Sequence, residues 1–186
     1  MKVYLLDTNI ASALWDQGDK HHADALKFVT DAAANGDLVY VSRVTIAEIE
    51  YGYKLHLSAD PARRAKAEAA MRAYKAIREI DKGTTEHYAN IRAELFRRFA
   101  PRDAKNRIRR VRPEQLVDKT TGLELGIQEN DLWIAAIGVE YNMILVTDDR
   151  MARIQDVAPS LTVVKWKRST TTPPPPPPTT PLLPGI

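Results

Sequence analysis

The chain contains no cysteine. Disulfide bridges, thiolate zinc sites, iron–sulfur clusters and cysteine nucleophiles are therefore excluded. Glycine is also scarce, with eight residues, and neither G-x-G-x-x-G nor G-x-x-x-x-G-K-[ST] occurs. The lack of such a phosphate-binding loop disfavours a nucleotide cofactor. No serine lies in a G-x-S-x-G setting, which removes the common α/β-hydrolase interpretation.

Long apolar runs are missing as well. The early stretch Val3–Leu6 ends at Asp7, far short of the roughly 20 residues that span a bilayer. We therefore expect no membrane role, and a reducing cytoplasm is the simplest location for a chain without cysteine. The four histidines lack the i, i+4 spacing of a zinc-binding helix and are expected at the surface: His21, His22, His56 and His87.

The length and composition indicate one folded domain with a tail. The chain has 186 residues, of which 44% are hydrophobic, enough for a single sizeable core. Residues 169–186 contain no charged residue and hold eight of the 12 prolines. Such a segment cannot supply the hydrogen bonds of a sheet, so it is expected to be an extended, disordered tail after a domain spanning residues 1–168.

Short apolar runs alternate with segments of helical periodicity in this domain. Strands are expected at Val3–Leu6, Leu38–Ser42, Met143–Thr147 and Leu161–Trp166. Strands that alternate with helices favour an α/β fold whose central parallel sheet is covered on both faces.

Several residues are candidate helix caps. Asp60 followed by Pro61 predicts a helix that runs to about Arg78. Two further helices are expected to be capped at Thr84 or Thr85 and at Asn130.

Four acidic residues are expected at one edge of this sheet. Asp7 and Asp149 each follow a predicted strand, and Glu48 and Asp131 lie near the start of predicted helices. The carboxyl ends of parallel strands form the ligand-binding edge of such folds. Carboxylates brought together repel one another unless a cation neutralises them, and Mg²⁺ or Mn²⁺ prefers oxygen ligands. This pattern is typical of a metal-dependent phosphodiester site.

Each acid also has a purely structural interpretation. Asp7 is a suitable cap for a helix over Thr8 to Trp15. Glu48 and Asp131 have the sign that favours a helix N-terminus, and adjacent aspartates such as Asp148 and Asp149 are common in turns. The case for a metal site therefore depends on their joint placement.

The segments that carry these acids resemble the ordered motifs of PIN domains, in particular those of VapC-type ribonuclease toxins. The matching segments are Leu5-Leu6-Asp7-Thr8-Asn9, Ser42–Thr45 with Ala47-Glu48 and Gly52, Asn130-Asp131-Leu132-Trp133-Ile134-Ala135-Ala136, and Ile144-Leu145-Val146-Thr147-Asp148-Asp149. The resemblance covers about residues 1–166. It implies a three-layer α/β/α sandwich and a Mg²⁺- or Mn²⁺-dependent ribonuclease, the toxin of a toxin–antitoxin pair that is blocked by a cognate antitoxin.

The resemblance also implies roles for particular residues. The acidic site would consist of Asp7, Glu48, Asp131 and Asp149. Supporting polar groups would be Thr8, Asn9, Thr147 and Asp148. Asp149 is preferred to Asp148 as the ligand because family members place this residue two positions after the threonine.

Positive charge is concentrated between Arg97 and Arg112. This stretch has eight basic residues and one acid, a local charge of +7, so the rest of a chain with net charge +3 carries −4. Most of it falls in an apparent insertion at about residues 100–124. The stretch is either a solvated face or an RNA-binding surface. The candidate RNA-binding residues are Arg102, Lys105, Arg107, Arg109, Arg110 and Arg112.

Two other functions compete with the ribonuclease. An aspartate-nucleophile phosphatase would use Asp7, but such enzymes need an acid two positions later, where Asn9 lies. A non-catalytic module would bind RNA through the basic stretch alone. Apolar residues at helical spacing over Tyr51–Leu57 and Ala69–Ile80 suit either core packing or a face for a homodimer or an antitoxin helix.

Overall fold

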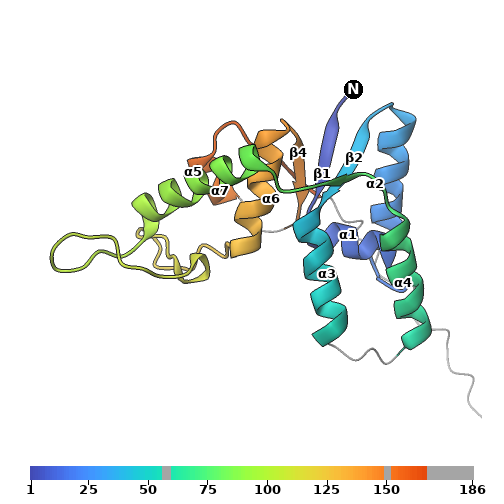
Figure 1. Cartoon of the computed structure of the whole chain (residues 1–186), viewed down its shortest axis with the longest axis horizontal. Helices are drawn as coiled ribbons and strands as arrows, with labels where there is room; N and C mark the ends of the chain where they lie inside the picture. The colour runs from blue at the N-terminus through green and yellow to red at the C-terminus, as the bar shows by residue number, and fades with distance from the viewer. Residues whose placement is uncertain (56–59, 149–151, 167–186) are drawn as a thin grey trace, which may run out of the picture.

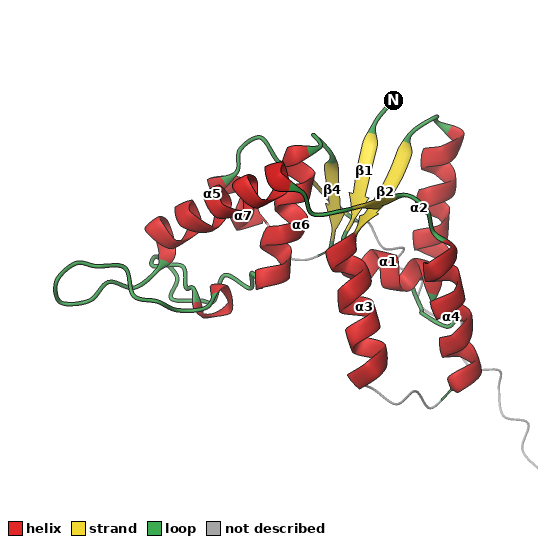
Figure 2. Ribbon diagram, viewed as in Figure 1, coloured by secondary structure: helices red, strands yellow, loops and turns green. Residues whose placement is uncertain are grey.

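A central sheet of parallel strands organises the protein (Figure 2). The structure, a computed structural model, describes residues 1–55, 60–148 and 152–166. The five strands of the sheet are β1 (Val3–Leu6), β2 (Leu38–Ser42), β3 (Ile77–Arg78), β4 (Ile144–Thr147) and β5 (Thr162–Lys165). Their order in space is β3-β2-β1-β4-β5, and every neighbouring pair is parallel.

Helices cover both faces of the sheet. Figure 1 shows α5, α6 and α7 on one side of the strands and α1 to α4 on the other. The prediction of a three-layer α/β/α sandwich is confirmed. The helices are α1 (Thr8–Trp15), α2 (His22–Ala34), α3 (Arg43–Leu55), α4 (Pro61–Ala73), α5 (Lys82–Phe99), α6 (Glu129–Glu140) and α7 (Ala152–Val157), with a short 3₁₀ helix, η1 (Pro113–Gln115).

Two hydrophobic cores separate these layers. Successive strand residues point to opposite faces of a sheet, so Leu5 and Leu6 belong to different cores. Leu5 packs in the core under α5, α6 and α7, and Leu6 packs in the core under α1 to α4. Both side chains are fully buried, as expected for a parallel sheet covered on both sides.

The strand order reverses beside β1. The chain moves from β1 outward through β2 to β3, and later crosses back to place β4 against the other side of β1. Ligands bind open α/β sheets at such a switch point, outside the carboxyl ends of the strands. The ends of β1 and β4, with Leu6 in register with Val146, therefore mark the expected location of a site.

Three details of the sequence prediction are wrong. The helix that begins after Asp60 ends at Ala73 instead of about Arg78. Tyr74 adopts an extended backbone and donates from its hydroxyl to Val39 O (2.9 Å), which turns the chain into the short strand β3. This edge strand pairs with β2 over only two residues, too few to show alternation in the sequence.

The other two errors concern helix caps. The cap of α5 is Asp81, whose carboxylate accepts from Thr84 N (2.9 Å), and neither Thr84 nor Thr85 occupies that position. The cap of α6 is Gln128 and not Asn130. The side chain of Asn130 has a long-range partner instead.

Among the described residues, no helix is both long and apolar enough to cross a bilayer. The proposed tail at residues 169–186 lies outside the described part of the chain.

The role of β1 in both cores predicts the effect of Leu5→Ala. Because Leu5 is 0% exposed, the change should leave a cavity and lower the free energy of unfolding by about 2–5 kcal/mol. Urea unfolding followed by circular dichroism measures this. Val164→Ala is the control, since Val164 is 43% exposed on β5 and should lose less than about 1 kcal/mol. Equal losses in both variants would contradict the assignment of Leu5 to the core.

Candidate active site

Asp7 lies at the junction between β1 and α1. Its backbone is extended, and its carboxylate Oδ1 accepts from Thr8 N (2.7 Å), so it caps the helix. The cap predicted from the sequence is therefore present. Yet Asp7 is only 2% exposed, which is unusual for a helix cap at a protein surface. A buried carboxylate at a sheet switch point needs further stabilising partners.

Thr147 supplies one of these partners from the neighbouring strand. It is the last residue of β4, it is 1% exposed, and its Oγ1 donates to Asp7 Oδ2 (2.7 Å). Asp7 N in turn donates to Val146 O (3.0 Å). Both oxygens of Asp7 thus accept hydrogen bonds, which fixes the carboxylate plane.

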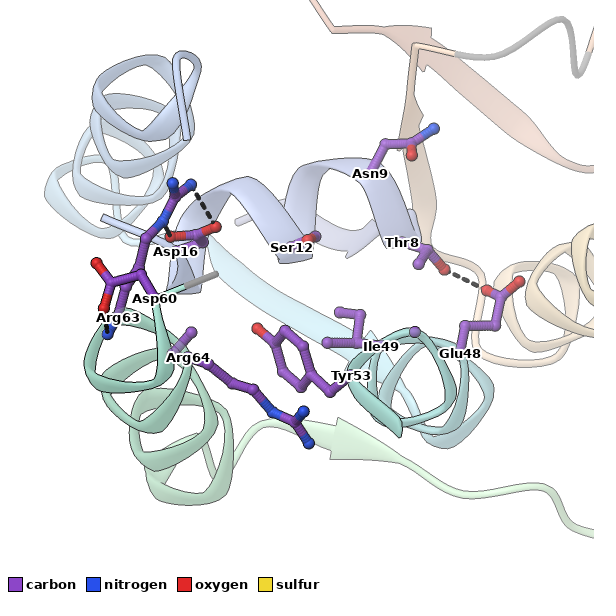
Figure 3. Close-up of a pocket in the computed structure, with 12 residues that line it drawn as sticks. Thr8, Asn9, Ser12, Asp16, Glu48, Ile49, Tyr53, Asp60, Arg63 and Arg64 are labelled. Atoms are coloured by element: carbon purple, nitrogen blue, oxygen red, sulfur yellow. Dashed lines mark hydrogen bonds and ion pairs between the residues drawn. The ribbon is translucent and has the colours of Figure 1, made fainter. Parts of the chain in front are cut away.

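Glu48 reaches the same place from α3. Its Oε2 accepts from Thr8 Oγ1, as Figure 3 shows, and its Oε1 accepts from Asn130 Nδ2 (2.8 Å). The start of α3 is held by Ser42, whose buried hydroxyl accepts from Thr45 N (2.8 Å). Hydrogen bonds therefore connect five residues at the ends of β1 and β4 and near the starts of α1, α3 and α6: Thr147, Asp7, Thr8, Glu48 and Asn130.

Asp131 lies in the first turn of α6, next to Asn130. Its Oδ2 accepts from Gln128 N (2.7 Å), an arrangement that stabilises the beginning of the helix. Asp131 is half-buried, so its carboxylate is partly open to solvent.

The remaining predicted site residues lie around this group. Asn9 is exposed and lines a groove beside Thr8. Asp148 is half-buried and lines a second groove beside Thr147. Asp149, the preferred fourth acid, lies outside the described residues.

The donor set suits a hard divalent cation. Asp7 and Glu48 offer carboxylate oxygens, and both carboxylates accept a hydrogen bond from Thr8. Asp131 adds a third carboxylate from the first turn of α6. Oxygen donors match Mg²⁺ or Mn²⁺, which keep several water ligands and need few protein carboxylates. Within residues 1–55, 60–148 and 152–166, however, no three acidic or histidine side chains are grouped so that they could hold a metal ion by themselves.

A groove of about 550 Å³ extends from Glu48 between α1, α3 and α4 (Figure 3). Thr8, Asn9 and Glu48 line one part of it, and Asp16 and Arg63 line another. Arg63 makes a two-point ion pair with Asp16, from Nε to Oδ1 (2.6 Å) and from a terminal guanidinium nitrogen to Oδ2 (2.7 Å). This hydrogen bond from Arg63 holds the pKa of Asp16 below its ordinary value.

A second groove, also about 550 Å³, begins at Thr147 and Asp148. Asp118, Arg153 and Lys165 line it as well, and Arg153 forms an ion pair with Asp118. Two grooves of similar volume thus begin at Thr8 and at Thr147, the two residues that contact the Asp7 carboxylate.

The predicted RNA-binding residues are not part of this group. All six are exposed on the segment between α5 and η1: Arg102, Lys105, Arg107, Arg109, Arg110 and Arg112.

Sequence reasoning missed the role of Asn130, which it interpreted as a helix cap. An amide directly before an acid at a helix start was the available signal, but its partner Glu48 is 82 residues away. Nothing in the local pattern identifies Glu48 as that partner.

Comparisons with known proteins connect this geometry to a family. The sequence model described as "PIN domain" matches residues 4–158. No curated protein matches the chain.

Solved structures are similar in fold. VapBC2 from Rickettsia felis, bound to a DNA fragment from their promoter, has a TM-score of 0.58 at 21% identity, covering 89% of this chain and 99% of that one. DNA-bound VapBC from Salmonella typhimurium has a TM-score of 0.55 at 19% identity, covering 90% of this chain and 100% of that one. VapBC-5 from Mycobacterium tuberculosis, of the VapBC family of toxin-antitoxin systems, has a TM-score of 0.52 at 20% identity, covering 89% and 99%.

The Asp16–Arg63 pair predicts a pH effect at the groove. Because the pKa of Asp16 is lowered, the pair stabilises the fold fully above the ordinary value of 3.8 and loses this contribution as the pH falls through the lower folded value. In Arg63→Gln the pKa of Asp16 should rise toward 3.8, measured by carboxyl ¹³C NMR titration. Arg72→Gln, which removes a partner of Glu68 on the same helix, should leave Asp16 unchanged. An unchanged Asp16 titration in Arg63→Gln would rule out this cause.

Proposed function

This chain belongs to the PIN domain family, and on that premise we propose that it is a Mg²⁺- or Mn²⁺-dependent ribonuclease and the toxin of a toxin–antitoxin pair. The observation that carries the proposal is the buried Asp7 carboxylate at the sheet switch point, joined through Thr8 to Glu48. The similarity in fold to VapBC structures supports it.

The proposed metal ligands are Asp7, Asp131 and Asp149, with Glu48 as a further ligand or as the group that orients water. A divalent ion bound there would lower the pKa of a coordinated water and offset charge on the phosphodiester oxygens. Thr147 and the N–H of Thr8 fix the orientation of Asp7, and the hydroxyl of Thr8 and the amide of Asn130 do the same for Glu48. Such positioning groups tune the ligands that they contact.

The two rival functions are less well supported. A phosphatase that used Asp7 as nucleophile would need a proton donor at position 9, and the amide of Asn9 does not titrate. A non-catalytic RNA-binding module would not need two carboxylates joined through Thr8 at the switch point, because such a pair adds repulsion without benefit.

The partners proposed for the protein are RNA, a cognate antitoxin and a second copy of the chain, in the cytoplasm. The antitoxin is expected to cover the groove between α3 and α4, beside the exposed apolar side chains of Tyr51 and Leu55 on α3. A protein bound there would block access to Glu48, which lines the same groove.

Replacing Asp7 tests the reaction. Asp7→Asn keeps an oxygen that can accept from Thr8 N, so α1 stays capped while a ligand charge is lost. RNA cleavage in Mg²⁺ or Mn²⁺ should fall by about 100-fold or more, since a metal contributes several kcal/mol to the transition state. The assay compares total and transfer RNA with each ion and with EDTA.

Asp31→Asn is the matched control, because Asp31 is an exposed aspartate on α2 that pairs with Lys27. It should cleave like the parent. A folded Asp7→Asn variant that cuts RNA at the parental rate would overturn the proposed ribonuclease.

Replacing Thr8 tests the positioning of Glu48. Thr8→Val keeps the shape of the side chain but removes the hydroxyl that donates to Glu48. Cleavage should fall about 10- to 100-fold, mainly in kcat, as expected when a second-layer contact to a metal site is lost. Thr30→Val removes a hydroxyl that only donates to the backbone of α2 and should have no effect on cleavage. Equal activity of both variants would show that the contact between Thr8 and Glu48 has no role in the reaction.

A further inference from the structure

Unpaired positive charge is concentrated on residues 101–112, which we call the basic arm. Elsewhere many arginines are neutralised by nearby acids, as in Arg43 with Glu79 and Arg63 with Asp16. On the arm the only acid, Asp103, pairs with Arg107. Arg102 is exposed as well and donates to Asn106 O (3.0 Å). The four remaining exposed cations form no ion pair with any described residue: Lys105, Arg109, Arg110 and Arg112.

The arm has a defined backbone structure. Asp103 Oδ1 accepts from Lys105 N (2.8 Å) and Arg107 N (2.9 Å), which closes a tight turn. Arg102 and Ile108 then pair as an antiparallel bridge, and Arg109 N donates to Pro101 O (2.9 Å). The cations are therefore displayed on a preformed hairpin, and binding costs less ordering entropy than it would on a flexible loop.

The arm is connected to the candidate active site through its base. The chain leaves the arm through η1, where Pro113 and Leu116 are buried in the domain. Glu114 Oε1 then accepts from Glu129 N (3.1 Å), the first residue of α6. The same helix turn carries Asn130 and Asp131. Figure 1 shows the arm projecting past the end of α5, with the returning chain leading to α6.

The composition of the arm indicates what it recognises. Residues 101–112 contain no aromatic side chain, so the arm offers no platform on which unpaired bases can stack. Arginine and lysine instead contact phosphates, which fix the position of a nucleic acid without reading its sequence. RNA helices are recognised in this way, by shape and by their backbone.

We infer that the basic arm binds the phosphate backbone of a helical region of the substrate RNA and delivers an adjoining strand to the site at the start of α6. Because this inference names a class of substrate, it rests on the proposed ribonuclease function. The arm thus favours structured RNAs that are long enough to contact both surfaces.

Binding is tested apart from cleavage in the full chain carrying Asp7→Asn, using fluorescence anisotropy of a labelled RNA hairpin across a range of salt concentrations. The arm variant replaces Lys105, Arg109, Arg110 and Arg112 by Gln. The control variant replaces four exposed cations outside the arm by Gln, with the same change in net charge: Lys27, Arg43, Lys66 and Arg72.

We expect the arm variant to bind at least about tenfold more weakly at low salt, with the control near the parent. The plot of log affinity against log salt should become less steep, with the magnitude of its negative slope smaller by about 3. Each of the four lost phosphate contacts removes about 0.7 to 0.9 from that magnitude. Equal affinities and slopes in the two variants would overturn the inference. The inference would also be overturned if the arm variant lost affinity for duplex DNA or polyglutamate but kept the parental affinity for the RNA hairpin.

Cleavage by otherwise unmodified protein supplies the second readout. The arm variant should raise KM for a structured RNA without changing kcat, and should cut a tetranucleotide as the parent does. If the parent cuts no RNA, the proposed ribonuclease fails while arm-dependent binding still stands. If the parent cuts RNA and the arm variant has an unchanged KM, the inference about the arm fails alone.

Discussion

The contact between Asp7 and Thr147 is the constraint on which the rest of the site depends. It joins residues 140 positions apart, at the ends of β1 and β4, the two parallel strands at which the strand order reverses. Asp7 also caps α1, and the hydroxyl of Thr8, the first residue of that helix, donates to Glu48. The buried carboxylate therefore links the end of β1 to β4 and to the start of α1, and Thr8 extends this connection to α3. The fold and the chemistry of the site share this single anchor.

The sequence predicts those parts of the fold that are governed by burial. Strands β1, β2 and β4 are short apolar runs with buried residues, and the end of β1 locates Asp7 correctly, whereas β5 is an edge strand whose residues are mostly exposed. Local rules fail where tertiary contacts prevail. Asn130 has the features of a helix cap, yet it contacts Glu48 on another helix. Tyr74 ends α4 because its hydroxyl reaches β2, a partner that no local pattern reveals.

The same distinction applies to the candidate site. Residues at the carboxyl ends of parallel strands can be placed at one edge of the sheet from topology alone, as the contact between Asp7 and Thr147 illustrates. The connection from Thr8 to Glu48 and on to Asn130 depends on how α3 and α6 lie beside α1, and spacing does not encode this. Asp149 remains a prediction, since the described residues stop at Asp148 before resuming at position 152.

The segment between α5 and α6 has a consequence for how such proteins diversify. The helices on either side of it pack against each other, and Pro113, Leu116 and Ile127 anchor its base in the domain, while residues 102–110 lie outside both cores. Lengthening a loop of this kind costs only about 0.6 kcal/mol for each doubling. Relatives can therefore lengthen this projection, shorten it or change its charge at little cost in stability. Transplanting such an arm is then a practical way to direct one catalytic scaffold toward a new target.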